Sequence, residues 1–291
     1  MELRVLRYFL AVVEERNISR AAEKLHVSQP TISRQIKELE EEVGITLLNR
    51  DNRTITLTAP GEYFANQARQ IMKLADKTIA NVQQTAAISG NIMIGSAEVP
   101  MMRTIADTIK ALHHKWPHVQ ANIYSTDVNE VHEQLNNGVF DFGVVMEPSD
   151  KHDYNFINLP GTTRWGIMSR VDQPLAKHSV IIAEDLVNQS LITSQGAHES
   201  DILNNWMGNN ASTAHIIATY NLLYNASIMV SAGVGSALCL EGIVNTTDTD
   251  LTFVPLEPVL QAHSSLIWSK HMPLSAAANA FLSLLQTQIA V

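Results

Sequence analysis

The sequence predicts a three-part chain: a small helical domain with a β-hairpin, one long helix, and an α/β domain with mostly parallel strands. Three observations predict this order. Apolar residues recur every three or four positions through residues 3–43, one apolar seam continues over residues 60–87, and strand-like and helix-like segments alternate from Asn91 onward. With 291 residues, the chain is long enough for two domains, one of them subdivided.

The composition excludes several classes of protein. Hydrophobic residues make up 45% of the chain and charged residues 17%, which excludes global disorder. No uninterrupted apolar run reaches about 18 residues, which argues against a membrane span. The N-terminus, MELRVLRYF, makes a poor signal peptide, so we expect a cytoplasmic protein with no membrane partner. Cys239 is the only cysteine, so neither an intramolecular disulfide nor a cysteine-based zinc site is possible.

The charge is distributed unevenly along the chain. The net charge is −9, which taken alone disfavours nucleic acid as a partner. Residues 1–90, however, hold 12 of the 20 Lys and Arg and 11 of the 29 Asp and Glu, so they carry +1 while residues 91–291 carry −10. Because the local field decides binding, this distribution leaves a DNA-binding face possible in the first 90 residues.

Three short helices are expected before residue 44. The first spans Leu3–Glu14, with its apolar residues on one face. Asn17 is suited to cap the second helix, and Ser28 to cap the third, where Pro30 fits the first turn. Gly44 ends the third helix.

A hairpin and a long helix follow. Thr46–Leu48 and Thr54–Thr58 alternate like two strands around a turn at Asp51-Asn52. From Pro60 to about Ala87 the apolar seam predicts roughly 40 Å of helix. A helix of that length needs a partner, for which we expect the same helix of a second copy. Ser89-Gly90 marks the domain boundary.

From Asn91 the segments alternate between strand and helix. Expected strands are 92–95, 119–125, 140–146, 165–169, 191–193, 237–240 and 264–268. Expected helices are 101–114, 128–136, 200–207, 222–232 and 275–288. Such alternation is typical of an α/β domain.

The third helix has two distinct faces. Its buried stripe consists of Ile32, Ile36 and Leu39, and polar side chains cluster on the opposite face. Glutamine can pair with adenine, arginine with guanine or phosphate, and serine with either. The alternative is that any amphipathic surface helix exposes polar residues. The hairpin arginines can reach phosphate or a minor groove, although Arg50 can equally pair with Glu40–Glu42. The candidate DNA-contacting residues are Ser28, Gln29, Pro30, Thr31, Ser33, Arg34, Lys37, Arg50 and Arg53.

The segment that holds this helix resembles the winged helix-turn-helix of LysR-type transcriptional regulators. The matching residues are Ala21-Ala22, Ser28-Gln29-Pro30, Ser33-Arg34-Gln35-Ile36, Leu39-Glu40, Leu47-Leu48-x-Arg50 and Leu57-Thr58-x-x-Gly61. This is a long ordered pattern and therefore specific. Two positions depart from it without threatening the fold: phenylalanine is usual at Leu48 and alanine at Pro60. The similarity continues weakly over the whole chain.

The resemblance implies a C-terminal domain like a periplasmic binding protein, with two α/β halves around an effector cleft. The halves would be 91–160 with 266–291, and 161–265. The residues agree in part, because two segments each follow a strand and open a helix, where free N–H groups suit a carboxylate or another anion. The candidate effector-binding residues are Ser96, Ala97, Glu98, Val99, Pro100, Ser194, Gln195 and Gly196, and, from the resemblance, Thr126, Glu147 and Asn221.

The sequence allows more than one interpretation of three features of this domain. Glu98 can repel anions, select a ligand with an amine or hydroxyl, or be a solvated residue at a helix start. Gly233-Val234-Gly235 fits either the family's GxG turn or a plain helix C-cap. Met101-Met102 is more typical of core packing than of a contact to an apolar effector. Cys239 is more typical of core packing than of a redox sensor.

No catalytic or metal motif occurs in the sequence. His132-Glu133 and His198-Glu199 lack the second histidine of HExxH, and Pro117 separates His118 from His113-His114. GxSxG, Walker and GxGxxG patterns are absent. We therefore expect no catalytic residues, no metal and no cofactor.

Together these features predict a DNA-binding transcriptional regulator with residues 1–58 as DNA-binding domain, 59–89 as dimerisation helix and 90–291 as effector domain. The expected partners are double-stranded DNA, a small-molecule effector, a second copy in a dimer or tetramer, and RNA polymerase. Effector binding would change closure of the cleft and thereby DNA bending. The alternatives are an enzyme that uses the α/β domain and a structural DNA binder with no effector.

Overall fold

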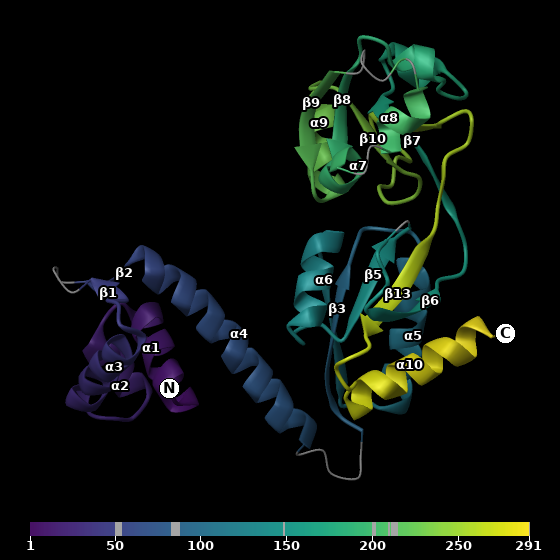
Figure 1. Ribbon diagram of the computed structural model, residues 1–291. Coiled ribbons are helices and arrows are strands. Elements are labelled where there is room, and N and C mark those ends of the chain that lie inside the picture. The colour runs from purple at the N-terminus through teal and green to yellow at the C-terminus, as the bar shows by residue number, and fades with distance from the viewer. Residues whose placement is uncertain are drawn as a thin grey trace. The chain divides into compact units, whose positions relative to one another are not determined.

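The computed structural model describes residues 1–49, 54–82, 88–147, 149–199, 202–208, 210 and 215–290. Internal contacts divide the chain into two compact units, residues 1–83 and 84–291. Figure 1 shows a helical N-terminal unit and a C-terminal unit built on two β-sheets. In the described part of the chain, no helix is long and apolar enough to cross a membrane.

The N-terminal unit contains the three predicted helices, α1 (Leu3–Glu15), α2 (Ile18–Lys24) and α3 (Gln29–Val43). Asn17 caps α2 as predicted, because its Oδ1 accepts a hydrogen bond from the backbone N–H of Arg20 at 3.1 Å. Ser28 occupies the N-cap position of α3, but its hydroxyl bonds the Thr31 hydroxyl at 2.7 Å instead of a backbone N–H. Gly44 ends α3 in the left-handed conformation, at φ 77°.

The hairpin is shorter than predicted. β1 (Leu48–Asn49) pairs antiparallel with β2 (Thr56–Leu57). The expected turn, Asp51-Asn52, lies outside the described residues. At the entry to β1, the backbone N–H groups of Leu47 and Leu48 donate to the Glu40 carboxylate at 2.8 and 3.0 Å. A side chain of α3 therefore fixes the residues that lead into the hairpin.

The long helix α4 (Ala59–Val82) is confirmed over residues 59–82, and its predicted end at Ala87 lies outside the described residues. Ala68 and Met72 are buried against Leu6 of α1. Other apolar side chains of α4 are exposed, namely Ile71, Leu74 and Ile79. One side of the helix thus belongs to the core of the N-terminal unit, and another side presents apolar groups to the outside.

The C-terminal unit begins with a five-stranded sheet of order β4-β3-β5-β13-β6. Its strands are β3 (Gly90–Ser96), β4 (Val119–Ser125), β5 (Phe142–Met146), β6 (Tyr154–Asn158) and β13 (Ser264–Ser269). Its helices are α5 (Met102–Lys115), α6 (Val128–Asn136) and α10 (Ala276–Ile289).

Alternating side chains place these helices on the two faces of the sheet. Ile92 and Ile94 of β3 belong to one buried cluster with residues of α5 and α10, whereas Met93 packs with Val131 and other residues of α6. Because successive side chains of a strand point to opposite faces, the two clusters lie on opposite sides of the sheet.

The second sheet has six strands, in the order β11-β7-β10-β8-β9 with β12 also paired to β7. The strands are β7 (Thr163–Arg170), β8 (Ser190–Ser194), β9 (His215–Tyr220), β10 (Ser236–Leu240), β11 (Leu251–Pro255) and β12 (Gln261–Ala262). The helical segments are η1 (Pro174–Lys177), η2 (Ala183–Leu186), α7 (Gln195–Glu199), α8 (Ile202–Met207) and α9 (Leu223–Ser231).

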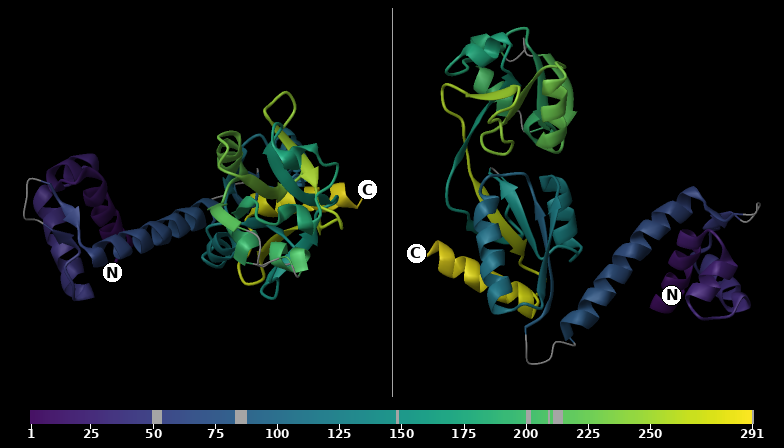
Figure 2. Two further views of the ribbon diagram at one scale, coloured as in Figure 1. Left: turned by 90° about the horizontal axis from the view of Figure 1, so that it is seen from above. Right: turned by 180° about the vertical axis from the view of Figure 1, so that it is seen from behind.

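The chain passes between the sheets twice, once between β6 and β7 and once between β12 and β13 (Figure 2). We call the part around the five-stranded sheet half I and the part around the six-stranded sheet half II. β13 begins at Ser264, two residues before the boundary expected from the sequence.

The expectation of mostly parallel strands is correct only for β4-β3-β5 and β9-β8-β10. β13 and β7, the strands that follow the two crossings, run antiparallel to their neighbours. They enter their sheets directly from the other half. The helical crossover that usually joins parallel strands is therefore not required there.

Candidate functional site

The polar face of α3 is held outward by the residues buried behind it. Ile32, Ile36 and Leu39 are at most 2% exposed and pack with Ala21 and Ala22 of α2. Alanines at this crossing let the two helices approach closely, which is the geometry of a helix-turn-helix. The candidate side chains Ser28, Gln29, Pro30, Arg34 and Lys37 are exposed, and Thr31 and Ser33 are half-buried.

The cations on this face are only weakly engaged within the protein. The Arg34 side chain is 72% exposed and its Nε lies 3.6 Å from the Glu38 carboxylate. The Lys37 side chain is 71% exposed and its Nζ lies 3.5 Å from that of Glu41. Exposed ion pairs of this kind contribute about 1 kcal/mol or less, so phosphates or base edges can compete for both groups. The two predicted hairpin contacts, Arg50 and Arg53, lie outside the described residues.

A second candidate site is a pocket in the C-terminal unit, between the strand ends of its two halves. Half I contributes the residues that end or follow β3, β4 and β5, and half II those that end or follow β8, β9 and β10. Ligands of open α/β sheets bind at such carboxyl ends of parallel strands. The pocket encloses about 190 Å³. The lining includes Ala97, Glu98, Thr126, Asp127, Met146, Glu147, Trp165, Ser194, Gln195, Tyr220, Asn221, Leu223 and Leu240.

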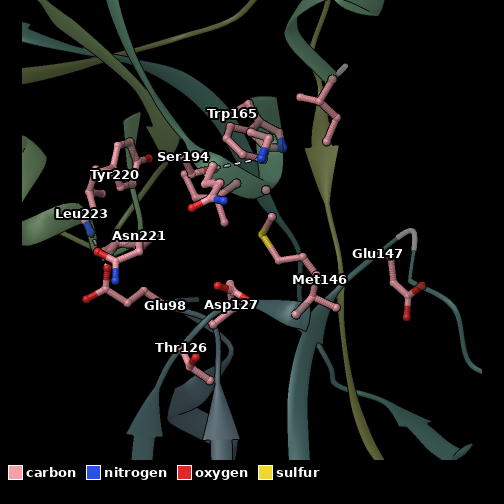
Figure 3. Close-up of a pocket in the computed structure, with 18 residues that line it drawn as sticks. Glu98, Thr126, Asp127, Met146, Glu147, Trp165, Ser194, Tyr220, Asn221 and Leu223 are labelled. Atoms are coloured by element: carbon pink, nitrogen blue, oxygen red, sulfur yellow. Dashed lines mark hydrogen bonds between the residues drawn. The ribbon is translucent and has the colours of Figure 1, made fainter. Parts of the chain in front are cut away.

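A hydrogen bond joins the two halves across this pocket. The backbone N–H of Leu223, at the start of α9 in half II, donates to the Glu98 carboxylate of half I at 2.5 Å. Glu98, Asn221 and Leu223 lie together on one side of the pocket, and Met146 and Trp165 lie on the other (Figure 3). A negative group at a helix N-terminus is favoured by the helix dipole, so Glu98 is stabilised where it stands.

Glu147 lies at the margin of the pocket within a polar network (Figure 3). Its carboxylate accepts hydrogen bonds from Lys151 Nζ and from the Ser265 hydroxyl, each at 2.5 Å. Burial alone raises the pKa of Glu147. The hydrogen bonds from Lys151 and Ser265, the charge of Lys151 and the N–H of Ser149 together outweigh burial and lower it. Glu147 is thus an ionised residue whose charge is already balanced.

Comparison with known proteins identifies both parts of the chain. The model for the bacterial regulatory helix-turn-helix protein, lysR family, matches residues 3–62, and the LysR substrate binding domain matches residues 85–290. The chain belongs to the LysR family of transcriptional regulators. It is accordingly a DNA-binding transcriptional regulator with a C-terminal effector-binding domain.

Individual LysR-family members resemble this chain over two thirds or all of its length. The Hca operon transcriptional activator HcaR of Escherichia coli K12 is 28% identical over 100% of this chain and 99% of HcaR. The regulator AlsR of Bacillus subtilis is 34% identical over 66% of this chain and 64% of its own length. The crystal structure of CbnR has the same fold, with a TM-score of 0.76, 23% sequence identity and 99% coverage of both chains.

The structure brings most of the expected effector residues of this LysR-family domain together. Ala97, Glu98, Thr126, Glu147, Ser194, Gln195, Gly196 and Asn221 line the pocket. Ser96, Val99 and Pro100 are not among the lining residues: Ser96 is 3% exposed and donates to the carbonyl of Ala97, and Val99 is buried in the core. The segment that follows β3 leads into α5, which begins at Met102, one residue after the predicted start.

Three N–H groups near the strand ends are not free to face an anion. The Ala97 N–H donates to the Val144 carbonyl at 3.0 Å, because this residue continues the pairing of β3 with β5. The Ala197 N–H donates to Ser194 Oγ at 3.1 Å. At α9, the Leu223 N–H is taken by Glu98. Glu98 is therefore a pocket residue bonded across the cleft and not a solvated helix-start residue.

The geometry also decides between the alternative interpretations of the GxG segment, Met101 and Cys239. Gly233 has φ 81°, and its N–H donates to the Val230 carbonyl just after α9, so the Gly233-Val234-Gly235 segment is a helix C-cap. Met101 and Cys239 are 5% and 2% exposed and belong to buried clusters. Burial raises the pKa of Cys239 to about 12. Within the described residues, no group of three or more His, Cys, Asp or Glu side chains is placed to hold a metal ion.

Sequence reasoning missed several lining residues, among them Asp127, Met146, Trp165, Tyr220 and Leu223. Met146 and Tyr220 end strands, and Asp127 and Leu223 follow within three residues of a strand end, which is the signal that could have identified them. Tyr220 ends β9, an element that the sequence did not predict. Trp165 is 3% exposed as a whole, so only part of its surface reaches the pocket.

Proposed function

We propose that the polar face of α3 docks in the major groove of an operator, with Gln29, Ser33 and Arg34 toward base edges and with Lys37 toward phosphate. The observation that supports this most strongly is the exposure of Arg34 directly opposite the buried Ile32 and Ile36. Ser28, Pro30 and Thr31 lie at the N-terminal end of the same helix, where backbone contacts position a recognition helix. The hairpin arginines complete the proposed contact surface.

The test uses an operator selected from random duplexes with the full-length protein, and then Arg34→Ala against Arg4→Ala. Arg4 is an exposed arginine on α1, 65% exposed, so its loss changes the charge equally outside the α3 face. A lost base contact costs about 1–3 kcal/mol at one base position, whereas a lost phosphate contact weakens all sequences alike. We expect Arg34→Ala to relax specificity at one position and Arg4→Ala to leave the sequence preference unchanged. If both variants and the unmodified protein bound the operator equally, the result would contradict the proposal that α3 contacts DNA.

We further propose that the pocket between halves I and II is the effector site and that its occupancy changes how the halves close on one another. A ligand shifts such an equilibrium only if it binds the two states differently, and contacts from both halves supply that difference. Ala97, Glu98, Thr126 and Asn221 are proposed contacts. A thermal-shift screen of small acids, amines and alcohols tests this site, because any ligand of the native state raises the midpoint.

The exposed apolar residues of α4, Ile71, Leu74 and Ile79, support a dimer through this helix. Replacing Ile79 with glutamate is expected to shift the protein toward monomer in light scattering at fixed concentration, because a charge in an apolar seam disfavours pairing. Lys73→Glu is the control, because Lys73 is exposed and lies about 100–160° around the helix from these three residues. A catalytic role is disfavoured, since the relatives named above are transcriptional regulators.

A further inference from the structure

The pocket between halves I and II has an unbalanced set of charges. Three of its lining side chains are carboxylates, those of Glu98, Asp127 and Glu147, and none of the described lining residues is a lysine, arginine or histidine. A site built for a carboxylate ligand usually offers it arginine, lysine or convergent N–H donors. The charged side chains that line this pocket are negative instead of positive.

The three carboxylates differ in how they are balanced. Glu147 is paired with Lys151, and Asp127 accepts the N–H of Glu130 at 2.9 Å as the N-cap of α6. Glu98 accepts the N–H of Leu223, and in the described part of the chain no cationic side chain forms an ion pair with it. Glu98 and Asp127 each accept a backbone N–H, and neither forms an ion pair among the described residues, but only the bond of Glu98 crosses from half I to half II.

Three backbone N–H groups of residues that line the pocket are already engaged. The Ala97 N–H donates within the sheet of half I, the Ala197 N–H donates to Ser194 Oγ, and the Leu223 N–H donates to Glu98. To use any of these three donors an anionic ligand would have to break a bond, and it would also face Glu98. Like charges brought together in a partly dry site repel more strongly than in water.

The rest of the lining is mostly apolar. Side chains of Val128, Met146, Trp165, Ile202, Leu223, Leu240 and Ile243 contribute to it. At about 190 Å³ the pocket is smaller than the roughly 300–1,000 Å³ of sites for drug-sized ligands, so it fits a compact molecule. Trp165 and Met146 lie across the pocket from Glu98 (Figure 3), so a ligand with one apolar end and one polar end matches the lining.

We propose that this pocket selects a small apolar molecule that carries a protonated amine, with the ammonium group on Glu98 and the apolar body against Met146 and Trp165. The inference rests on the proposed function in that it takes the pocket to be the effector site. A carboxylate has two oxygens, so one can keep the Leu223 N–H while the other accepts the ammonium. The ligand would then be tied to both halves, because Glu98 itself bridges them.

The experiment compares three probes that share one ring and differ in charge: benzylamine, benzyl alcohol and benzoate. Binding to the full-length protein is measured by calorimetry for the unmodified chain, Glu98→Gln and Glu133→Gln. Glutamine keeps an oxygen that can accept the Leu223 N–H, so Glu98→Gln removes the charge with little change in shape. Glu133 is an exposed residue of α6 outside the pocket lining, and its variant loses the same charge.

We expect the unmodified protein and Glu133→Gln to bind benzylamine most tightly and benzoate most weakly. Glu98→Gln should weaken benzylamine by about tenfold or more, as expected for a lost charge-assisted hydrogen bond, and leave benzyl alcohol unchanged. Unchanged binding of benzyl alcohol also shows that the variant is folded.

Three results would overturn the inference: benzoate binding as tightly as benzylamine, Glu98→Gln retaining the preference for the amine, or none of the three probes binding. Operator binding by the same samples without probe is measured in parallel. Its loss would contradict the proposed function, whereas intact operator binding with the wrong charge preference would contradict only the ligand class.

Discussion

Removal of the Glu40 carboxylate is expected to loosen the β1–β2 hairpin. The carboxylate, on the last turns of α3, accepts the backbone N–H groups of Leu47 and Leu48 at 2.8 and 3.0 Å. Both leucines are at most 2% exposed, so water replaces these bonds poorly. Leaving two N–H groups without an acceptor costs about 2–4 kcal/mol in the local opening free energy, or about 30- to 800-fold in the exchange rate of the two amides.

Hydrogen exchange measured by mass spectrometry on the full-length Glu40→Ala variant tests this directly, because it reports the hairpin without requiring two-state unfolding. Glu41→Ala is the matched control: Glu41 is the next residue, is exposed, and meets only Lys37 at 3.5 Å among the described ion pairs. Peptides covering residues 47–48 should exchange faster in Glu40→Ala alone. Equal exchange in both variants would refute the role assigned to Glu40. Since the predicted arginine contacts follow β1, Glu40→Ala should also weaken operator binding.

Three further predictions concern the C-terminal unit. Gly143→Ala should destabilise half I by about 1–3 kcal/mol in thermal unfolding, because a Cβ there would lie 2.3 Å from Val131 Cγ1, whereas Gly196→Ala, with no neighbour within 4 Å, should not. The folded-state pKa of Glu147 is lowered, so its stabilisation is present above its unfolded pKa and is lost as the pH falls through the folded value; Glu147→Gln should flatten the acid limb of stability against pH. Cys239, with a pKa of about 12 and 2% exposure, should react with a thiol reagent only after denaturation, and rapid native labelling would contradict the buried placement.

The N-terminal unit follows closely from local sequence. The spacing of Ile32, Ile36 and Leu39 determines the buried face of α3, and that face in turn determines which polar residues are exposed. Asn17 and Gly44 mark helix ends by their own chemistry. The role of Glu40 could not be predicted in the same way, because the exposed run Glu40–Glu42 looks like a solvated face until the chain folds back beside it.

The sequence did not predict four of the strands. β6, β9 and β11 are edge strands of their sheets, and β12 has two residues and pairs with β7. β4, which is also an edge strand, was predicted. An edge strand packs against one neighbour only, so its apolar pattern is weaker: β9 alternates exposed and half-buried residues with none fully buried. Central strands such as β10, in which every residue is buried, were predicted. The bond between Glu98 and Leu223 joins residues 125 positions apart and depends on how the halves meet, so no local pattern signals it.

The strength of this bond limits what an effector can do through a single cleft. A ligand that strengthens or breaks the bond between Glu98 and the Leu223 N–H changes the balance of open and closed forms by about the value of one charge-assisted hydrogen bond, roughly 1.5 kcal/mol or tenfold. A shift from mostly open to mostly closed needs about 5.5 kcal/mol. Through this bond, a single cleft therefore supplies only part of the free energy that the switch needs. Two or more clefts coupled through the exposed apolar seam of α4, together with the apolar contacts that closure adds around Trp165, would supply the rest. The proposed dimer would thus enlarge the switch, and a monomeric variant that still binds ligand should show a smaller response in operator affinity.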